Sequence, residues 1–515
     1  MKLSSSFALI LLLSTARAAA QEAAPSDEEL AQDAALAKLG KDSESLDGPA
    51  SSTKKSPFVY DLRLNLMLTA TGNDPETRLL YDVMQRPLLG PVVVFRRDEL
   101  LRPRAARVYP SLSAAAGAEW ELSDLVLLRA LVDSGELRDG STVEPEVDGV
   151  ALNGQPVGDE LRSLSIVREL SITLGKQAFE VELGRLRATV AEGLVYDDFG
   201  TGARARLDLA EAGSIPLHAE LVATTVGQRT SRLQENPMLA LEIAYDASLL
   251  ESIGVFAALA SDKSGALSDV LRSSVAERHL AMPVALNALF SDDKGHGQIG
   301  YLGAHAQLLV ASKLLLRATA VLSTGAFSLT IPQASGQSAQ QKIEVRSGAA
   351  DVELHYTLSS KLDLATYAFA LSGDDSPTGA KSTYHAFIGL APYWVWTGLF
   401  FSGGLNQSLL ANRAAAAGVN GHGVIGAGPA IERSDAHGSA ELRVIWLEAI
   451  APPPAAPYGG SGRAYGLEAD LHGQWKATRW LSAGAELDVL IPGNYFPENT
   501  IAYRMLGLVS VAYGN

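Results

Sequence analysis

Residues 60 to 69 alternate between two kinds of side chain at every position. Successive residues of a strand point to opposite faces of a sheet, so this run predicts a strand with two unlike faces. About ten residues is also the length that a tilted strand needs to cross a bilayer. We therefore expect one face to meet lipid and the other to meet water. The first face holds Tyr60, Leu62, Leu64, Leu66 and Leu68, and the second holds Asp61, Arg63, Asn65, Met67 and Thr69.

The same alternation returns along most of the chain. It is clearest over residues 203–209, 217–221, 316–320, 351–358, 465–475 and 481–489, and in the fifth of these segments Tyr465 shares the apolar face with Leu467. The number of such segments is roughly sixteen to eighteen, within the range of membrane barrels. The sequence therefore predicts an all-β fold, a single transmembrane antiparallel β-barrel over residues 57–515 with long loops. The strands over 114–132 and 238–259 are the least regular of those expected.

The start of the chain predicts export from the cytoplasm. Lys2 gives a positive start, residues 7–13 are a short apolar run, and residues 18–20 are three alanines that suit cleavage. The run is too short to cross a bilayer as a helix, so residues 1–20 are expected to be a signal peptide. Residues 21–56 are polar and predict a periplasmic linker, with a short helix over 28–39 as the alternative.

Composition agrees with a barrel and excludes one class of partner. Charged residues are 19% of the chain, below the roughly 25% of ordinary soluble domains. The chain has no cysteine, and a closed sheet needs no disulfide because each strand is hydrogen-bonded on both edges. The net charge of −16 argues against a nucleic acid partner, because binding there depends on neutralising phosphates.

One long segment without charge could be mistaken for a membrane helix. Residues 386–412 contain five glycines or prolines, at 389, 392, 398, 403 and 404, which would break a helix repeatedly. We therefore expect two strands joined near Pro392, with Tyr393, Trp394 and Trp396 in an aromatic girdle at the membrane interface. Three other stretches, 72–110, 262–297 and 451–462, are expected to be long loops, one of which could fold into the pore as a plug.

Motifs for catalysis are missing from the sequence. There is no phosphate-binding loop of the Walker type, and the nine histidines show no zinc-ligand spacing. Glu468 and Asp470 lie on one face of a strand and could in principle hydrolyse a glycosidic bond, but a hydrated wall explains them better. We expect no catalytic residue, no metal and no cofactor, and hence a protein that is not an enzyme.

Two segments, 168–209 and 466–496, carry a pattern of motifs. The first contains Arg168-Glu169, a strand that ends in Gly175-Lys176-Gln177, the step Gly184-Arg185, and the turn Asp198-Phe199-Gly200. The second contains Trp480-Leu481 and then Ile491-Pro492-Gly493-Asn494. This pattern resembles the alginate export family of outer-membrane porins. The family carries Arg where this chain has Lys176, and Phe-Asp-Gly where it has Asp198-Phe199-Gly200.

The resemblance implies a channel for an anionic polysaccharide that passes an arginine-rich constriction. Guanidinium groups on a wall would attract carboxylates and hold them bidentately. Arg168 shares the face of Ile172 and Leu174, so we place it near an interface and outside the pore. The alternative is that the arginines pair with Asp61, Asp208 and Glu220 and only brace the barrel. The expected pore-lining residues are Arg63, Arg185, Arg187, Arg204, Arg206, Asp208, Arg317, Glu468 and Asp470.

Three functions remain open from the sequence. The first is a passive channel of the bacterial outer membrane, in contact with outer-membrane lipid, that passes an anionic polysaccharide or a small anionic solute. The second is a structural or adhesive outer-membrane barrel whose pore is plugged. The third is a secreted soluble β-rich protein that binds or hydrolyses carbohydrate, which requires the apolar faces to pack inside.

Overall fold

The computed structural model divides the chain by its internal contacts into Met1–Ser51 and Ser52–Asn515, and all of the described residues belong to the second unit. The predicted signal peptide and the predicted linker lie outside them. Within these residues, no helix is both long and apolar enough to span a membrane. The structure describes residues 58–72, 107–133, 137–138, 166–176, 178–213, 215–226, 236–248, 250–263, 267, 271, 295–332, 338–375, 383–401, 414–453, 460–496 and 501–514.

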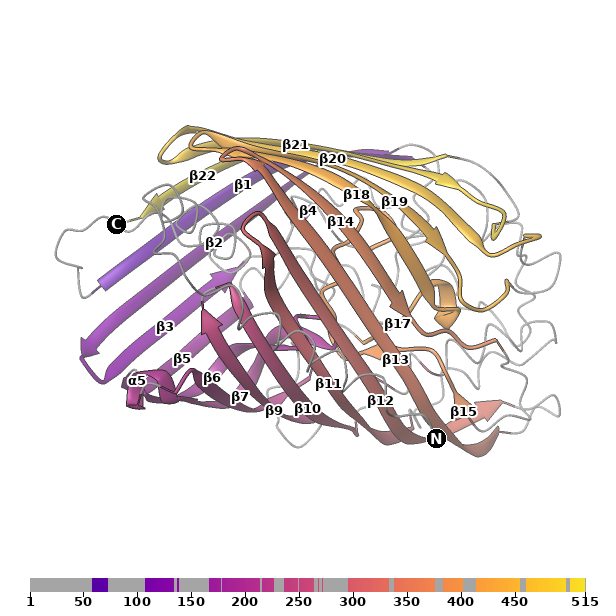
Figure 1. Cartoon of the computed structure of the whole chain (residues 1–515), viewed down its shortest axis with the longest axis horizontal. Helices are drawn as coiled ribbons and strands as arrows, with labels where there is room; N and C mark the ends of the chain where they lie inside the picture. The colour runs from indigo at the N-terminus through magenta and orange to yellow at the C-terminus, as the bar shows by residue number, and fades with distance from the viewer. Residues whose placement is uncertain are drawn as a thin grey trace. The chain divides into compact units, whose positions relative to one another are not determined.

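The described chain is built almost entirely of strands (Figure 1). They are β1 (Phe58–Gly72), β2 (Arg107–Ser123), β3 (Val126–Asp133), β4 (Leu137–Arg138), β5 (Ile166–Lys176), β6 (Phe179–Val190), β7 (Tyr196–Asp208), β8 (Leu217–Thr225), β9 (Pro237–Ser248), β10 (Glu251–Asp262), β11 (His296–Ala311), β12 (Leu314–Pro332), β13 (Ser338–Ser359), β14 (Leu362–Leu371), β15 (Thr383–Tyr384), β16 (Ile388–Gly389), β17 (Ala415–Ala416), β18 (Val424–Asp435), β19 (Gly438–Glu448), β20 (Ala464–Thr478), β21 (Leu481–Pro492) and β22 (Ala502–Gly514). Two short helices are α5 (Leu209–Gly213) and η6 (Val419–Gly421).

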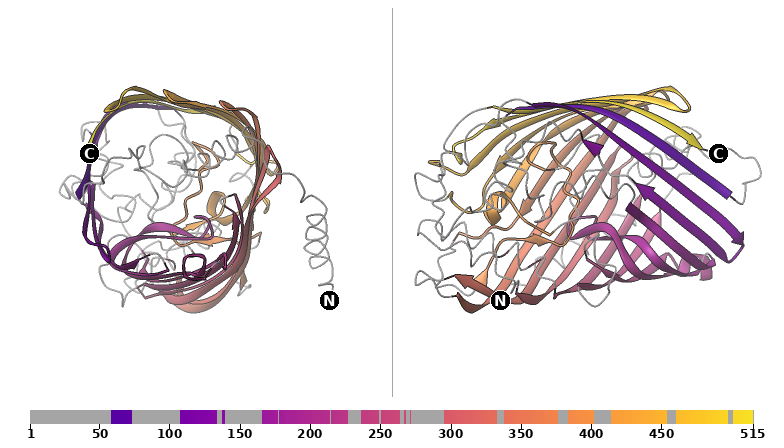
Figure 2. Two further views of the ribbon diagram at one scale, coloured as in Figure 1. Left: turned by 60° about the vertical axis from the view of Figure 1, so that its left-hand side comes forward. Right: turned by 180° about the vertical axis from the view of Figure 1, so that it is seen from behind.

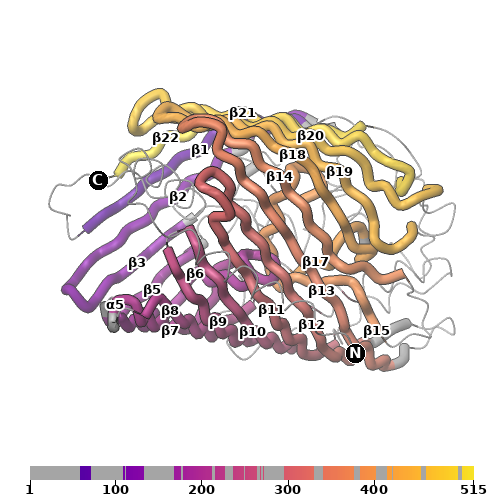
Figure 3. Tube along the Cα trace, in the orientation of Figure 1, coloured from indigo at the N-terminus to yellow at the C-terminus, as the bar shows by residue number. Residues whose placement is uncertain are grey.

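One closed antiparallel sheet forms the wall of a barrel. Twenty of the described strands belong to this sheet, and two of them, β4 and β15, are only two residues long, which leaves eighteen wall strands. Each wall strand pairs with the next one along the chain, and β1 pairs with β22 to close the ring. Figure 2 shows the ring, and Figure 3 shows the strands running obliquely side by side. The predicted fold class is correct, and the strand number is at the upper end of the expected range.

The two faces of β1 lie as the alternation predicts. Leu62, Leu64, Leu66 and Leu68 point outward with 46–56% of their surface exposed, whereas Met67 and Thr69 between them are 2–3% exposed. The same alternation holds in β9–β12, where Leu239, Val255, Leu302 and Leu322 are exposed on the outside. An exposed apolar band of this kind suits contact with hydrocarbon. The closed sheet also suits it, because no strand edge is left without a hydrogen-bond partner. The apolar faces therefore do not pack into a dry interior.

The two ends of the barrel differ. At one end the strands are joined by tight turns, such as 123–126, 359–362 and 435–438, and exposed aromatic side chains gather beside these turns. They are Phe58, Trp120, Phe179, Tyr245, Tyr356, Trp475, Trp480 and Tyr513. Their arrangement matches the aromatic girdle that anchors membrane barrels at an interface. The long connections, including those between β14 and β18 and between β10 and β11, lie at the other end.

The prediction for Tyr393, Trp394 and Trp396 was wrong. Residues 390–401 contain only an isolated bridge at Ala391 and no continuous strand, and Trp394 and Trp396 are 8% and 6% exposed inside the barrel. The absence of charge was the signal for membrane contact, but an apolar segment can also be buried within the barrel. Here the connection from β14 to β18 turns inward, and we call residues 383–401 and 414–423 the inner loop.

A second segment also leaves the wall. β6 and β7 pair with each other up to Val190 and Tyr196, but β6 pairs with β5 only to Arg185, and β7 pairs with β8 only to Gly202. The residues beyond these points, 186–201, therefore bind only to each other within the sheet. Val190, Ala191, Leu194, Val195 and Tyr196 are at most 3% exposed, so the tip is buried in the barrel. We call residues 186–201 the inner hairpin.

Paired glycines mark the point where the inner hairpin departs. Gly184 lies opposite Gly202. Gly184 has a φ of 132°, which L residues with a side chain rarely adopt. A Cβ on Gly202 would lie 1.9 Å from the carbonyl oxygen of Ala223. The hairpin can thus fold inward because its backbone approaches the neighbouring strand without side chains between them.

Gly202→Ala is expected to destabilise the barrel by about 1–3 kcal/mol, the usual cost of inserting a methyl group where there is no room. The measurement is urea unfolding of the protein refolded in detergent. Gly507→Ala is the matched control, because a Cβ on this strand glycine would meet nothing within 4 Å. Equal unfolding midpoints for the two variants would contradict the role assigned to Gly202.

Two residues lie on the opposite face of the wall from the one predicted, because the strand is irregular at each. Arg168 was placed near an interface by its parity, but it is buried, with 8% exposure. The register of β3 against β5 shifts beside it, so Arg168 is the extra residue of a β-bulge. Tyr465 was placed on the outer face, yet it is fully buried. Gly466 follows it with a φ of 141°, and Tyr465 donates its hydroxyl to the carbonyl of Gly423 on the inner loop.

Candidate pore constriction

The inner hairpin and the inner loop bind to each other through their backbones. Leu390 and Ala391 donate N–H groups to the carbonyl of Val195 at 2.8 and 3.4 Å, and Asp197 donates to the carbonyl of Ala391 at 2.8 Å. Tyr393 donates to Gly193 at 2.9 Å. These contacts join two segments about 200 residues apart in the sequence. Both are held inside the barrel as one body.

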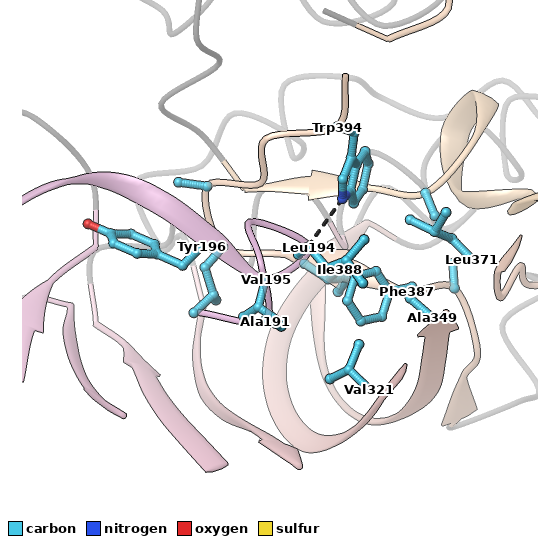
Figure 4. Packing of buried hydrophobic residues seen from close by; sticks show 14 of the residues in the cluster. Ala191, Leu194, Val195, Tyr196, Val321, Ala349, Leu371, Phe387, Ile388 and Trp394 are labelled. Carbon is cyan, nitrogen blue, oxygen red and sulfur yellow. Dashed lines mark hydrogen bonds between the residues drawn. The ribbon is translucent and has the colours of Figure 1, made fainter. Parts of the chain in front are cut away.

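Apolar side chains fill the space around this junction. Figure 4 shows Phe387, Ile388 and Trp394 of the inner loop against Leu194 and Val195 of the inner hairpin, with the indole N–H of Trp394 donating to the carbonyl of Leu194 at 3.1 Å. Wall residues such as Val321 and Leu371 close the cluster from outside. One side of the barrel interior is therefore packed like a protein core.

Aromatic rings extend this packing toward β18–β22. The ring of Trp396 stacks on Phe369 of β14 with centroids 4.1 Å apart, and Phe401 packs edge-on against both rings. Phe400 contacts Tyr465, which in turn contacts Tyr495. Aromatic pairs with these geometries are favourable beyond the area that they bury. The inner loop is consequently fixed to the wall over much of its length.

Charged wall residues hold the backbone of the inner loop. The guanidinium of Arg443 donates from one nitrogen to the carbonyls of Val395 and Trp396, each at 2.7 Å. The carboxylate of Glu468 accepts the N–H groups of Leu399 and Phe400, and Asp470 accepts that of Gly398 at 3.2 Å. An arginine thus binds the carbonyls, and two carboxylates bind the next N–H groups along the chain.

Glycine at position 398 allows this close approach. A Cβ there would lie 2.5 Å from the carboxyl carbon of Asp488, so a larger residue would require the carboxylate or the inner loop to shift. Asp488 also contacts Arg504 at 2.9 Å, and Arg504 binds Glu486 at 2.6 Å. The side of the wall formed by β19–β22 is therefore a connected network of charges under the inner loop.

Glu468 and Asp470, expected on the pore surface, lie beneath this loop with 0% and 4% exposure. Both point inward from β20, but the inner loop covers them. Both carboxyl groups accept hydrogen bonds from the loop backbone. They act as anchors of the loop, a role that sequence alone could not assign.

The other predicted arginines lie beside carboxylates. Arg63 contacts Asp61 at 2.6 Å, and Arg204 contacts Glu182 on the neighbouring strand. Arg206 lies between Glu180 and Glu220 in the strand register, and Arg317 lies opposite Glu353 while its Nε donates to Gln307 at 3.0 Å. Asp208 lies opposite His218. All of these residues share the inward parity of their strands.

Arg185 and Arg187 lie at the inner hairpin and not on the regular wall. Arg187 makes a bidentate contact with Asp197, at 2.7 and 2.8 Å, while about 46% of its side chain remains exposed. Two of the guanidinium nitrogens of Arg185 are buried and have no hydrogen-bond partner. Of the predicted arginines, these two are the ones that the fold brings to the constriction.

Arg443 and Arg504 are inward arginines that the sequence prediction missed, and both belong to the charged network under the inner loop. Arg443 follows Glu441 and Leu442 in the same polar–apolar alternation that identified other strands, so its inward direction could have been found. Its partners on the inner loop could not, because they lie 47 or 48 residues away.

The described wall is strongly acidic on its inner side. By strand parity the inward arginines are Arg63, Arg129, Arg204, Arg206, Arg317, Arg443 and Arg504, and the β-bulge adds the buried Arg168. The inward carboxylates include Asp61, Glu119, Glu169, Glu180, Glu182, Asp208, Glu220, Glu242, Asp246, Asp351, Glu353, Asp363, Glu432, Glu441, Glu468, Asp470, Glu486 and Asp488. Carboxylates thus outnumber arginines by more than two to one. Across the described ranges, no group of three or more metal-ligating side chains is placed to hold a metal ion.

The closed sheet, its apolar outer band and its charged inner wall define a class of protein. In hydrocarbon every backbone polar group needs an internal partner, and a closed barrel is the only sheet that supplies one for each strand. Alternation of lipid-facing and lumen-facing residues together with an aromatic girdle is typical of bacterial outer-membrane barrels. This chain is a β-barrel of the bacterial outer membrane.

Comparison with known proteins gives structural neighbours but no family. No family model matches the sequence, and no curated protein matches it. Among solved structures, the outer membrane protein OprD from Pseudomonas aeruginosa is 11% identical, with 89% of this chain and 94% of that chain covered and a TM-score of 0.45. OpdK from the same organism, solved with vanillate, is 9% identical over 89% and 99% of the two chains, with a TM-score of 0.47. OccAB4 from Acinetobacter baumannii is 8% identical over 90% and 100%, with a TM-score of 0.47. At these identities and scores, what these proteins bind or transport says nothing about the solute of this chain.

Proposed function

We propose that this protein is a passive channel of the bacterial outer membrane for small hydrophilic solutes, narrowed by the inner hairpin and the inner loop. The observation that carries the proposal is the junction of these two segments inside a barrel whose wall is charged. A channel needs both a hydrated wall and a constriction that sets the size of what passes.

The orientation of the barrel follows from its turns. Outer-membrane barrels place short turns in the periplasm and long loops outside, so the end with the turns at 123–126 and 435–438 faces the periplasm. The inner loop then enters from the external side. Solutes arriving from outside meet the constriction before they reach the acidic wall between β13 and β19.

An anionic polysaccharide, which the resemblance to alginate export porins implies, finds little support in the contacts. The arginines expected to bind it lie beside Asp61, Glu182 and Asp197. A polymer also has to thread past a constriction fixed by hydrogen bonds on several sides. We therefore propose a small solute instead of a polymer.

Planar bilayer recording of the purified protein tests the proposal. We expect stable single-channel currents, and liposome swelling that is fast for monosaccharides and slow for tetrasaccharides. Heat-modifiable mobility in gels is the control that the protein is a folded barrel. A folded barrel without conductance would overturn the channel proposal in favour of a plugged structural or adhesive barrel, which the dense packing around the inner loop favours. A protein that is soluble without detergent would instead support the soluble β-rich alternative.

A further inference from the structure

Three carboxylates face each other across neighbouring strands near the periplasmic end. Asp363 of β14 lies directly opposite Glu432 of β18, and Glu432 lies opposite Glu441 of β19. We call these three residues the acidic row. Like charges directly opposite each other destabilise an antiparallel pair, so a fold that keeps three of them in line needs a compensating positive charge.

The cationic side chains near the acidic row pair either with Glu441 or with a carboxylate outside the row. Arg443 and His472 both contact Glu441, at 2.6 and 3.1 Å. His355 of β13 contacts Glu353 at 3.2 Å. Among the described contacts, Asp363 and Glu432 have no ion pair. The described ion pairs thus neutralise Glu441 at one end of the row, and none of them involves the other two carboxylates.

The burial of Asp363 is a second observation at this row. Its residue is 7% exposed, and its Oδ1 is buried with no hydrogen-bond partner. Leaving a buried charged acceptor unpaired is costly. Glu432 beside it is only half-buried, so the row can be reached from the water of the barrel.

From these contacts we infer that the channel selects solutes that carry a positive charge, and that Asp363 and Glu432 of the acidic row bind the cationic group as it passes. This inference rests on the proposed function, because it concerns the solute of that channel. The excess of carboxylates along the wall also favours positively charged solutes. A passage lined by one sign of charge concentrates the opposite ion and repels its own sign. The solute class is therefore a small amine or guanidine in place of the anion expected from the arginines.

The test is the reversal potential in a KCl gradient across a planar bilayer. For the unmodified protein we expect a cation-to-anion permeability ratio of about 5 or more at 0.1 M salt, since such clefts raise the local counter-ion concentration roughly tenfold or more. The ratio should fall toward 1 at 1 M salt, where the screening length is only about 3 Å. Putrescine should block the potassium current at lower concentration than succinate does.

The variants D363N and E432Q keep side-chain shape and remove charge, and together they should lower the permeability ratio at least twofold. Glu344→Gln is the matched control, because Glu344 is a half-exposed carboxylate beside Arg346 on the outward parity of β13, and it should leave the ratio unchanged. An unmodified channel that conducts but prefers chloride would overturn the inference and leave the proposed function intact. Absence of any conductance would overturn both. If the double variant does not fold, the cation-to-anion permeability ratio and the putrescine block of the unmodified protein still test the inference.

Discussion

Arg443→Met is expected to free the inner loop from the wall and to raise the single-channel conductance severalfold. The arginine donates to the carbonyls of Val395 and Trp396, contacts Glu441 at 2.6 Å, and lies 4.6 Å from the ring centre of Tyr367. Methionine fills a similar volume but offers no donor. The carbonyls then lose their partner, and Glu441 keeps only His472.

The expected loss of stability is about 3–5 kcal/mol, which is typical when one member of a buried ion pair is removed. Part of this loss falls on the inner loop and part on the wall. Urea unfolding measures the total loss of folding free energy, whereas planar bilayer recording reports whether the inner loop has become mobile. A loosened loop should give larger currents with frequent transitions between levels, because the constriction then has more than one position.

Arg129→Met serves as the control for loss of an arginine from the wall. Arg129 contacts Glu119 at 3.0 Å, both side chains are about one-third to one-half exposed, and their described contacts do not involve the inner loop. Exposed pairs of this kind contribute about 0–1 kcal/mol. If Arg443→Met and Arg129→Met give the same conductance and noise, Arg443 does not hold the constriction.

The barrel itself could be predicted from the sequence because its determinant is local. The alternation over residues 60–69 depends only on the period of a strand and on the two solvents that it separates, and Leu62 to Leu68 indeed point outward. The inward direction of Arg204 and Arg317 followed from the same rule. Where the strand register shifts, as at Arg168 and at Tyr465, the rule places the residue on the wrong side.

The constriction could not be predicted in this way, because its determinants are distant in sequence. Trp394 and Trp396 carry the composition of a membrane girdle, and nothing local distinguishes burial against Phe369 from burial in lipid. Glu468 and Asp470 were recognised as inward, but their function depends on N–H groups about 70 residues earlier in the chain. Gly184 was noted within a motif, without its pairing with Gly202 and the close backbone contact that explains both glycines.

The outward face of β1 makes the most direct test of the membrane assignment. Leu64 lies near the middle of the strand Phe58–Gly72, on its outer side, with 46% exposure. Leu64→Arg would place a guanidinium at the depth of the hydrocarbon core. Such a substitution costs about 2–4 kcal/mol near the bilayer midplane of a barrel, so we expect much less folded protein in liposomes, measured by the heat-modifiable band.

Asn65→Arg is the control, one residue further along the same strand. Asn65 points inward and donates to the hydroxyl of Ser113 at 3.2 Å, so an arginine there remains in the hydrated barrel and should assemble nearly as well as the unmodified protein. The two variants add the same charge to adjacent positions, and only the solvent that each side chain meets differs. Equal assembly of both would mean that the exposed leucines do not face lipid, and an outer-membrane channel would then be untenable.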